Sequence, residues 1–184
     1  MYLFDARIHD AVAAIEPSAR GEIEITDAIQ WLIDHGHRVR TELLEGWWID
    51  TGKLTPLLEA NRLLLETIEP RIEGTVDEAS TVDGRVVIED GARVVRSRIR
   101  GPVAIAAGSS VVDSFLGPFT AIGAGCEVTN SEIEHSVVMA GSRIIDIPRL
   151  EDSLIGRDAV VTRSQVRPRA LRLMVGDQCQ IDVE

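Results

Sequence analysis

A short pattern that returns at a nearly constant spacing constrains the fold of this chain more than any other feature of its sequence. Each copy begins with a branched aliphatic residue and ends four positions later with a small one. The aliphatic residues are Ile88, Ile105, Ile122, Val138 and Ile155, so the steps between successive copies are 17, 17, 16 and 17. A fixed period of this kind is typical of a stacked repeat, in which each coil of the chain packs only on its neighbours.

Further aliphatic residues lie between these anchors, at roughly a third of the period from one another. They are Val94, Ile99, Val111, Leu116, Val128, Ile133, Ile144 and Val161. Three apolar runs per period predict three short strands and three corners per coil, with the aliphatic side chains inside a prism. The small residues are expected at tight corners: Ala92, Ser109, Cys126, Ser142 and Ala159. A helical region is excluded because no apolar stripe of helical period persists.

Two details refine this register. The tripeptides that begin at Ser97, Ser114 and Ser131 recur at the full period, and a similar one begins at Ser164, about two periods after the last of them. The pattern is interrupted between residues 144 and 154, where Pro148 lies. Because proline cannot donate a ladder hydrogen bond, we expect a distorted coil or a small bulge there.

The rhythm resembles the hexapeptide repeat of the left-handed parallel β-helix family. The expected fold class is therefore mainly β, a left-handed parallel β-helix preceded by a small α/β segment. The hand follows from the resemblance alone, since most parallel crossovers are right-handed. We expect the β-helix over residues 70–184 with a C-terminal cap at 169–183, the α/β segment over residues 1–69, and a linker at 69–81.

The α/β segment has a different pattern of apolar residues, with stripes of helical period and isolated apolar runs. We expect strands at 2–4, 39–44 and 47–50 and a helix at 8–15. A second helix is expected to start at an Asp27–Gln30 capping box and to end at Gly36. A third is expected to start at Thr55 and Pro56 and to end at Pro70. So few short strands do not form a stable sheet by themselves. This segment therefore needs a larger sheet, the β-helix or a partner to cover its apolar side chains.

Composition excludes several classes of function. The net charge is −11, whereas a nucleic-acid-binding chain needs a basic face. Arg96, Arg98 and Arg100 alternate as an anion patch would, but the favoured interpretation is a solvated outer face. No apolar run is long enough to span a membrane, and no signal peptide is recognisable. Cys126 and Cys179 are expected to be reduced thiols, so we expect a cytoplasmic protein without nucleic-acid or membrane partners.

Two motifs resemble a known enzyme family. They are the run P-S-A-R-G-E-I-E-I-T-D at residues 17–27 and the run G-W-W-I-D-T-G-K at residues 46–53. Both are similar to the C-terminal part of the sugar-phosphate nucleotidyltransferases, in particular those of the glucose-1-phosphate thymidylyltransferase type. The longer members of this family carry a left-handed β-helix after the catalytic domain, so the resemblance covers essentially the whole chain.

The resemblance implies a reaction and two site residues. The family joins a sugar 1-phosphate to a nucleoside triphosphate and releases pyrophosphate, with Mg²⁺ held between carboxylates and phosphates. Asp50 matches the second aspartate of the metal pair, and Trp48 matches a residue that lines the sugar-phosphate pocket. Without the resemblance, Asp50 would be interpreted as the start of a turn and Trp48 as a core residue.

The family's glycine-rich G-x-G-T-R-L loop, first metal aspartate and pocket lysine are absent from these 184 residues. No complete catalytic set is therefore expected in this chain. We expect a C-terminal piece or a truncated gene product that is inactive alone and binds no Mg²⁺ by itself. Its β-helix would serve assembly or regulation, and a homo-oligomer is expected.

Two other functions stay open. The first is a hexapeptide-repeat acyltransferase that uses acetyl-CoA, for which His135 is the only candidate base within the repeats. Its coil shows no inserted loop, so an exposed strand residue is the favoured interpretation. The second is a purely structural oligomerisation module. Acetyl-CoA binding would distinguish the acyltransferase from both other functions.

Overall fold

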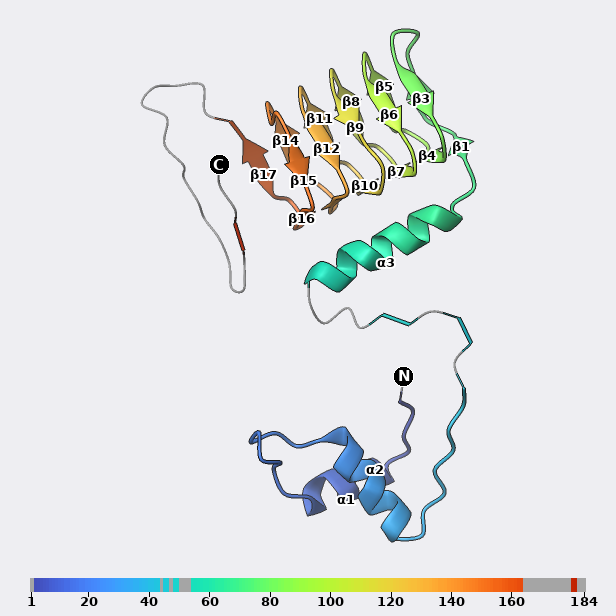
Figure 1. Cartoon of the computed structure of the whole chain (residues 1–184), viewed down its shortest axis with the longest axis vertical. Helices are drawn as coiled ribbons and strands as arrows, with labels where there is room; N and C mark the ends of the chain where they lie inside the picture. The colour runs from blue at the N-terminus through green and yellow to red at the C-terminus, as the bar shows by residue number, and fades with distance from the viewer. Residues whose placement is uncertain (1, 44, 47, 50–53, 164–179, 182–184) are drawn as a thin grey trace. The chain divides into compact units, whose positions relative to one another are not determined.

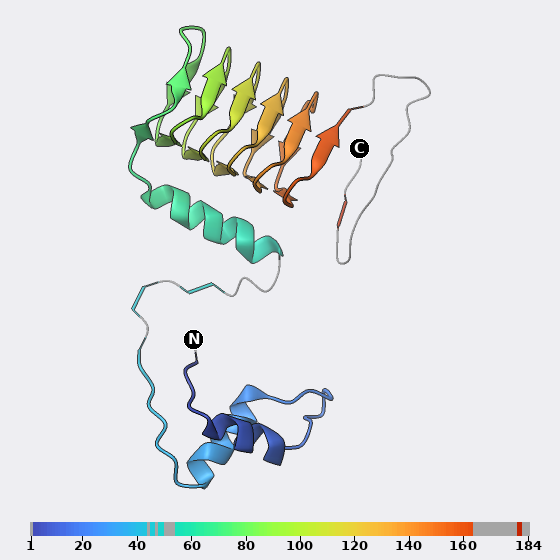
Figure 2. The ribbon, with the colours of Figure 1, turned by 180° about the vertical axis from the view of Figure 1, so that it is seen from behind.

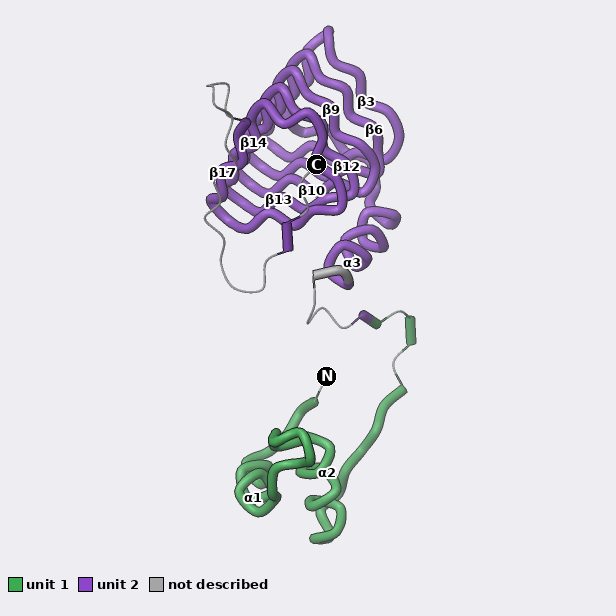
Figure 3. The backbone as a smooth tube through the Cα atoms, turned by 60° about the vertical axis from the view of Figure 1, so that its left-hand side comes forward, with its two compact units in different colours: residues 1–48 green, residues 49–184 purple. Residues whose placement is uncertain are grey.

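The computed structural model describes residues 2–43, 45–46, 48–49, 54–163 and 180–181. The chain divides into two compact units, Met1–Trp48 and Ile49–Glu184, which Figure 3 colours separately. The second unit contains a parallel β-solenoid, consistent with the predicted left-handed β-helix. Of the predicted cap at 169–183, only residues 180–181 are described. Ser164 also lies outside the described residues.

The solenoid is a prism with three parallel sheets as its faces (Figure 1). Sheet A contains β1 (Arg71–Ile72), β4 (Val86–Ile88), β7 (Val103–Ile105), β10 (Thr120–Ile122), β13 (Val137–Val138) and β16 (Leu154–Ile155). Sheet B contains β2 (Thr75–Val76), β5 (Arg93–Val95), β8 (Ser110–Val112), β11 (Glu127–Thr129), β14 (Arg143–Ile145) and β17 (Val160–Thr162). Sheet C contains β3 (Thr81–Asp83), β6 (Arg98–Arg100), β9 (Phe115–Leu116), β12 (Glu132–Glu134) and β15 (Leu150–Glu151).

The interior of the prism confirms the predicted register. The aliphatic residues predicted to point inward are buried from Ile88 to Ile144, and Ile155 and Val161 pack partly buried against them. On sheet A, a second inward position two places earlier in the strand holds a β-branched side chain, as at Val86, Val103 and Thr120. This face therefore contributes two inward side chains per coil, because strand side chains alternate between faces.

The corners depend on residues with left-handed backbone conformation. One corner stacks Gly91, Gly108, Gly125 and Gly141, all with positive φ, in register along the prism. Glycine adopts this conformation without the steric cost that a Cβ imposes. Four of the small residues predicted at tight corners follow directly after these glycines and are buried: Ala92, Ser109, Cys126 and Ser142. The fifth, Ala159, follows Asp158, which also has positive φ, and is half-buried.

The irregular step of the repeat has two visible causes. Across sheet A, Ala104 pairs with Ala121, an offset of 17, but Ala121 pairs with Val137, an offset of 16. The corner before β13 is thus one residue shorter. On sheet C, the offset returns to 17 where Ile133 pairs with Leu150. One extra residue is therefore accommodated at Pro148–Arg149, which confirms the predicted bulge.

Helix α3 (Leu54–Thr67) runs along the sheet A side of the solenoid (Figures 1 and 2). Its Asn61 side chain donates a 2.9 Å hydrogen bond to the carbonyl of Phe119. The Arg85 guanidinium donates to the Glu66 carbonyl, and Leu65 is buried. The outer face of sheet A carries a row of half-buried apolar residues in register: Val87, Ala104, Ala121, Val137 and Leu154. Helix α3 therefore belongs to the same compact unit as the solenoid.

The first unit contains two helices, α1 (Arg7–Ala14) and α2 (Ile25–Asp34). The buried apolar residues among its described part are Ala11, Ala28 and Leu32. Helix α2 ends as predicted at Gly36, which has positive φ and donates to the Ile33 carbonyl at 3.0 Å. The amide of His37 donates to the Leu32 carbonyl at 2.9 Å, which completes a Schellman motif.

Several local predictions were wrong. Residues 2–4, 39–43 and 48–49 form no strand, because no described segment of this unit supplies the neighbouring ladder that a strand needs; residues 44, 47 and 50 lie outside the described part. Helix α2 begins at Ile25 without a side-chain cap, so the Asp27–Gln30 capping box does not form. Residues 69–81 are not a linker, because β1, β2 and β3 begin there.

Among the described residues, no helix has the length and apolarity needed to cross a bilayer.

Candidate functional site

Residues 17–24 of the first motif form a loop held by one carboxylate, and residues 25–27 begin α2. Glu24 accepts a hydrogen bond from the Ser18 hydroxyl at 2.9 Å and from the Arg20 guanidinium at 2.7 Å. The Arg20 hydrogen bond, with a further contribution from Ser18, lowers the pKa of the Glu24 carboxyl. This loop precedes α2 directly, so the motif has a local structural role in fixing where that helix begins.

Trp48, the predicted sugar-phosphate contact, lies in the segment between α2 and α3. Its side chain is 68% exposed, so it packs into no core formed by the described residues. This excludes the interpretation of Trp48 as a core residue of the described unit. Asp50 lies outside the described residues, and its role as a metal ligand stays a prediction.

The described residues contain no group of three or more His, Cys, Asp or Glu side chains placed to hold a metal ion. A divalent cation generally takes six or more oxygen ligands, several of them from carboxylates or phosphates. The described part of the chain therefore does not provide a complete ligand set for Mg²⁺. Asp50 could supply one carboxylate of such a set.

His135 lies at a corner of the solenoid, not at the mouth of a loop. Its backbone has positive φ, its ring is 6.1 Å from the Phe119 ring in an edge-to-face contact, and its Nδ1 contacts Asp152 one coil further on. The ring is thus held by two neighbours at the surface of the prism. This arrangement explains His135 as a corner residue of the solenoid.

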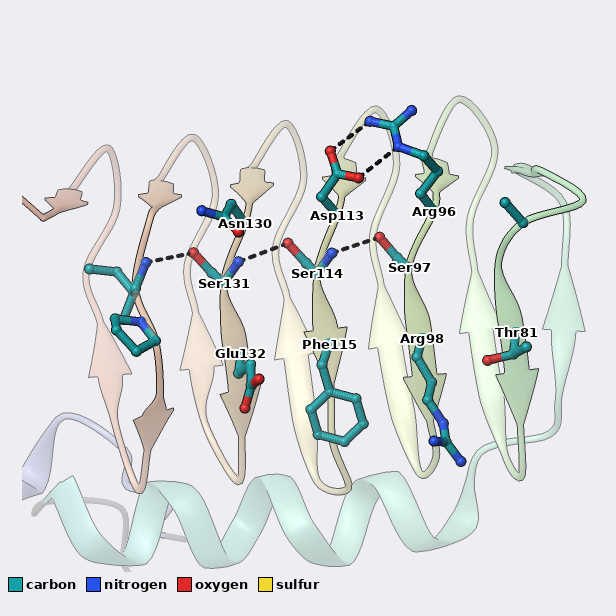
Figure 4. A pocket seen from close by; sticks show the side chains of 13 residues that line it. Thr81, Arg96, Ser97, Arg98, Asp113, Ser114, Phe115, Asn130, Ser131 and Glu132 are labelled. Carbon is teal, nitrogen blue, oxygen red and sulfur yellow. Dashed lines mark hydrogen bonds and ion pairs between the residues drawn. The ribbon is translucent and has the colours of Figure 1, made fainter.

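The described residues form a hollow of about 400 Å³ on the outer side of sheet C (Figure 4). It is lined by corner residues Arg96, Asp113 and Asn130 and by strand residues Arg98, Phe115 and Glu132. The Nε and Nη2 atoms of Arg96 both donate to the Asp113 carboxylate at 2.6 Å. These hydrogen bonds lower the pKa of the Asp113 carboxyl.

The floor of this hollow is a ladder of hydroxyl groups. The Ser97 Oγ accepts from the Ser114 amide at 3.0 Å, and the Ser114 Oγ accepts from the Ser131 amide at 3.1 Å. Each hydroxyl also donates to a carbonyl of its own coil, as Ser114 does to Val112 at 2.7 Å. No buried side-chain nitrogen or oxygen in the described part lacks a partner, so the floor has no unused polar group for a ligand.

The sequence prediction identified the serine ladder but missed the hollow. Arg96 was grouped with Arg98 and Arg100 on one strand, whereas it lies at the corner before β6. Arg98 and Arg100 are exposed on the outer face, as the favoured interpretation predicted. The missed signal was the regular spacing of Arg96, Asp113 and Asn130, each of which stands directly before a ladder serine.

The first unit leaves many large apolar side chains exposed. They are Tyr2, Leu3, Phe4, Val12, Ile23, Ile33, Val39, Leu43 and Trp48. Leu3 is 90% and Leu43 is 95% exposed, values far from those of a core residue. The site residue Trp48 is thus one of a set of apolar side chains that the described residues do not cover.

Comparison with known proteins locates both motifs in one family. Residues 1–67 match the family model of the nucleotidyl transferases. The chain is 51% identical over 183 residues to the glucose-1-phosphate thymidylyltransferase of Streptomyces griseus, covering 100% of this chain and 52% of the relative. It is 43% identical over 184 residues to the low-salt glycan biosynthesis nucleotidyltransferase Agl11 of Haloferax volcanii, covering 98% of this chain and 52% of that protein.

A third relative is the bifunctional protein GlmU of Methanococcus aeolicus, which is 35% identical over 161 residues, covering 86% of this chain and 39% of that protein. The chain thus spans about half the length of the first two relatives. The resemblance inferred from residues 17–27 and 46–53 is confirmed. This chain is similar over its whole length, the solenoid residues included, to the C-terminal part of glucose-1-phosphate thymidylyltransferases.

Proposed function

We propose that this chain, similar throughout to the C-terminal half of glucose-1-phosphate thymidylyltransferases, is the C-terminal part of such an enzyme. The reaction would join a sugar 1-phosphate to a nucleoside triphosphate and release pyrophosphate. Glucose 1-phosphate and a thymidine nucleotide are the substrates that the name of the Streptomyces griseus relative suggests. The observation that carries the proposal is that residues 1–67 match the nucleotidyl transferase family while leaving Trp48 uncovered.

The chain's own contribution to the site is small and specific. The exposed Trp48 ring would pack against the sugar phosphate, and the Asp50 carboxylate would hold one coordination position of Mg²⁺. When bound, Mg²⁺ neutralises charge on the phosphate oxygens. The remaining ligands and the glycine-rich loop are absent from these 184 residues. We therefore infer that the chain alone does not turn over nucleotide.

The solenoid would serve a different purpose, the assembly of copies into a homo-oligomer. Its coils have no described cluster of metal-binding or catalytic side chains, and its buried polar groups are satisfied. We also infer a cytoplasmic protein, which agrees with the free, buried thiol of Cys126.

A chimaera tests the proposed activity. The chain replaces the C-terminal 52% of the Streptomyces griseus relative, and pyrophosphate release is measured with glucose 1-phosphate and dTTP. We expect activity from the chimaera and none from the chain alone. An inactive, folded chimaera would overturn the proposal.

Two variants of the chimaera test the site residues. Asp50→Asn should lower kcat by about 100-fold or more, because several kcal/mol of charge stabilisation through the metal is lost. Trp48→Ala should mainly raise KM for the sugar phosphate. The matched control is Asp10→Asn on the exposed surface of α1, which should keep full activity. Full activity of Asp50→Asn would remove this residue from the site, and binding of acetyl-CoA to the chain would favour the acyltransferase instead.

A further inference from the structure

The outer face of sheet C has an unusual distribution of charge. Strand β6 presents Arg98 and Arg100, and strand β12 presents Glu132 and Glu134. Between them, β9 presents Phe115, which is half-buried. Figure 4 shows Arg98, Phe115 and Glu132 side by side on successive strands. The face is therefore basic on one side of an aromatic residue and acidic on the other.

Three of these four charges are not neutralised within the described part of the chain. Arg98, Arg100 and Glu132 are exposed, and none forms an ion pair with another described residue, whereas Glu134 pairs with Arg149 at 3.1 Å. Strands in a sheet lie about 4.8 Å apart, so Arg98 and Glu132 are separated by roughly 10 Å across Phe115. That distance is too long for a direct ion pair within the face.

Symmetry turns this pattern into a self-complementary surface. If a second copy stacks its sheet C face on this one about a two-fold axis parallel to β9, the order of strands is reversed. This rotation does not change the position of a residue along its strand. Arg98, Phe115 and Glu132 pair in register, so they lie at the same level along their strands. Arg98 of each copy then lies opposite Glu132 of the other. Phe115 meets its own counterpart, and the hollow beside it leaves room for the second ring.

We propose that sheet C is a homodimer interface, with its two-fold axis along β9 and with Arg98–Glu132 contacts made twice. A two-fold axis parallel to the solenoid would place like charges opposite each other, which costs free energy. The outermost strands add no complementary pair, since Asp83 would face Glu151. The interface is therefore confined to the central strands and is expected to be weak and salt-sensitive.

This inference rests on the assembly role proposed above and specifies its surface. The test is sedimentation equilibrium of the full chain at up to about 500 µM and low salt. Arg98→Glu and Glu132→Arg should each weaken self-association by about tenfold or more, since each creates two like-charge contacts. The matched control is Arg93→Glu on the outer face of sheet B, which should leave the dissociation constant unchanged.

Mixing the two variants provides the decisive measurement. In a heterodimer of Arg98→Glu with Glu132→Arg, one chain carries glutamate at both positions and the other carries arginine at both, so both contacts join opposite charges and the equimolar mixture should associate about as well as the unmodified chain. The double variant Arg98→Glu/Glu132→Arg exchanges both charges within one chain, so both of its contacts again join opposite charges. It should therefore associate about as well as the unmodified chain, and this recovery also shows that both substitutions are compatible with folding.

Three results would overturn the proposal. An oligomer that is insensitive to both single variants would remove sheet C but keep the assembly role. A double variant as weak as the single variants would exclude the two-fold arrangement. A monomeric chain at every concentration would remove the interface and the assembly role together. Nucleotidyltransferase activity of the chimaera is measured separately and is unaffected by any of these results.

Discussion

The two compact units bury their apolar side chains to very different extents. Among the described residues of the first unit, nine large apolar residues are exposed and the buried apolar residues are Ala11, Ala28 and Leu32. In the second unit, five large apolar residues are exposed among the described residues, while fifteen residues form one continuous buried cluster. The solenoid thus covers its own core, coil upon coil.

This difference shows what periodicity does for stability. Each interior coil has two similar neighbours that supply both the hydrogen-bond ladder and the apolar contacts. The helix pair of the first unit has no such neighbour among the described residues, and short helices are marginal without tertiary packing. We therefore expect the solenoid to unfold as a cooperative body and the helix pair to open independently at a lower free energy.

The largest expected effect is that of Ile122→Asp inside the prism. Ile122 is 2% exposed, and the interior offers no partner for a carboxylate, so we expect a loss of about 4 kcal/mol or more in the free energy of unfolding. Urea unfolding followed by circular dichroism measures it. The control is Ser110→Asp, which points outward from β8 and should change the value by less than about 0.5 kcal/mol. An unchanged midpoint for Ile122→Asp would show that the register is wrong.

The second-largest expected effect concerns the helix pair of the first unit. Leu32→Ala removes the largest buried side chain of the helix pair and should destabilise that pair by about 2–3 kcal/mol. Hydrogen exchange should accelerate over residues 7–34 and stay unchanged over residues 86–145. Faster exchange in the solenoid as well would mean that the two units unfold together.

A smaller effect is expected from Ser114→Ala in the hydroxyl ladder. This change leaves the buried Ser131 amide without its acceptor, which costs about 1–2 kcal/mol. Ser110→Ala, on the outer face of sheet B, is the matched control in the same urea titration. Equal stabilities for the two variants would show that the ladder contributes nothing.

The smallest effect is a dependence on pH. Burial raises the pKa of the Cys126 thiol, so above pH about 8.5 the unfolded chain releases a proton that the folded chain retains. The thiol's contribution to stability is therefore complete below that pH and declines as pH rises. In a Cys179→Ser background, Cys126→Ser should abolish this decline between pH 8 and 10. A decline of equal size in both proteins would assign it to other groups.

Much of the solenoid could be predicted from the sequence because its constraint is repeated. The positions of Ile88, Ile105 and Ile122 each confirm the others, so the register was determined several times over. Val86 and Val103 also point inward, at a second position that a pattern with one aliphatic anchor per run does not indicate. The strands of the first unit were predicted wrongly because local propensity does not supply a neighbouring strand.

The candidate site was less predictable for a related reason. Trp48 was identified through a resemblance, and the structure adds only that its ring is exposed. Asp50 lies outside the described residues, so its assignment stays a prediction. The Arg96–Asp113 contact joins residues of adjacent coils, and it becomes visible only when the coils are aligned by corner.

Helix α3 and the solenoid have matching dimensions. Its 14 residues rise about 1.5 Å each and so extend roughly 21 Å, a little more than four coils at about 4.8 Å per coil. The column can change in height only by whole coils, whereas a helix lengthens residue by residue. A variant with one inserted coil would extend about 4.8 Å further along the solenoid axis while α3 kept its length. The length of α3 therefore matches one particular number of coils.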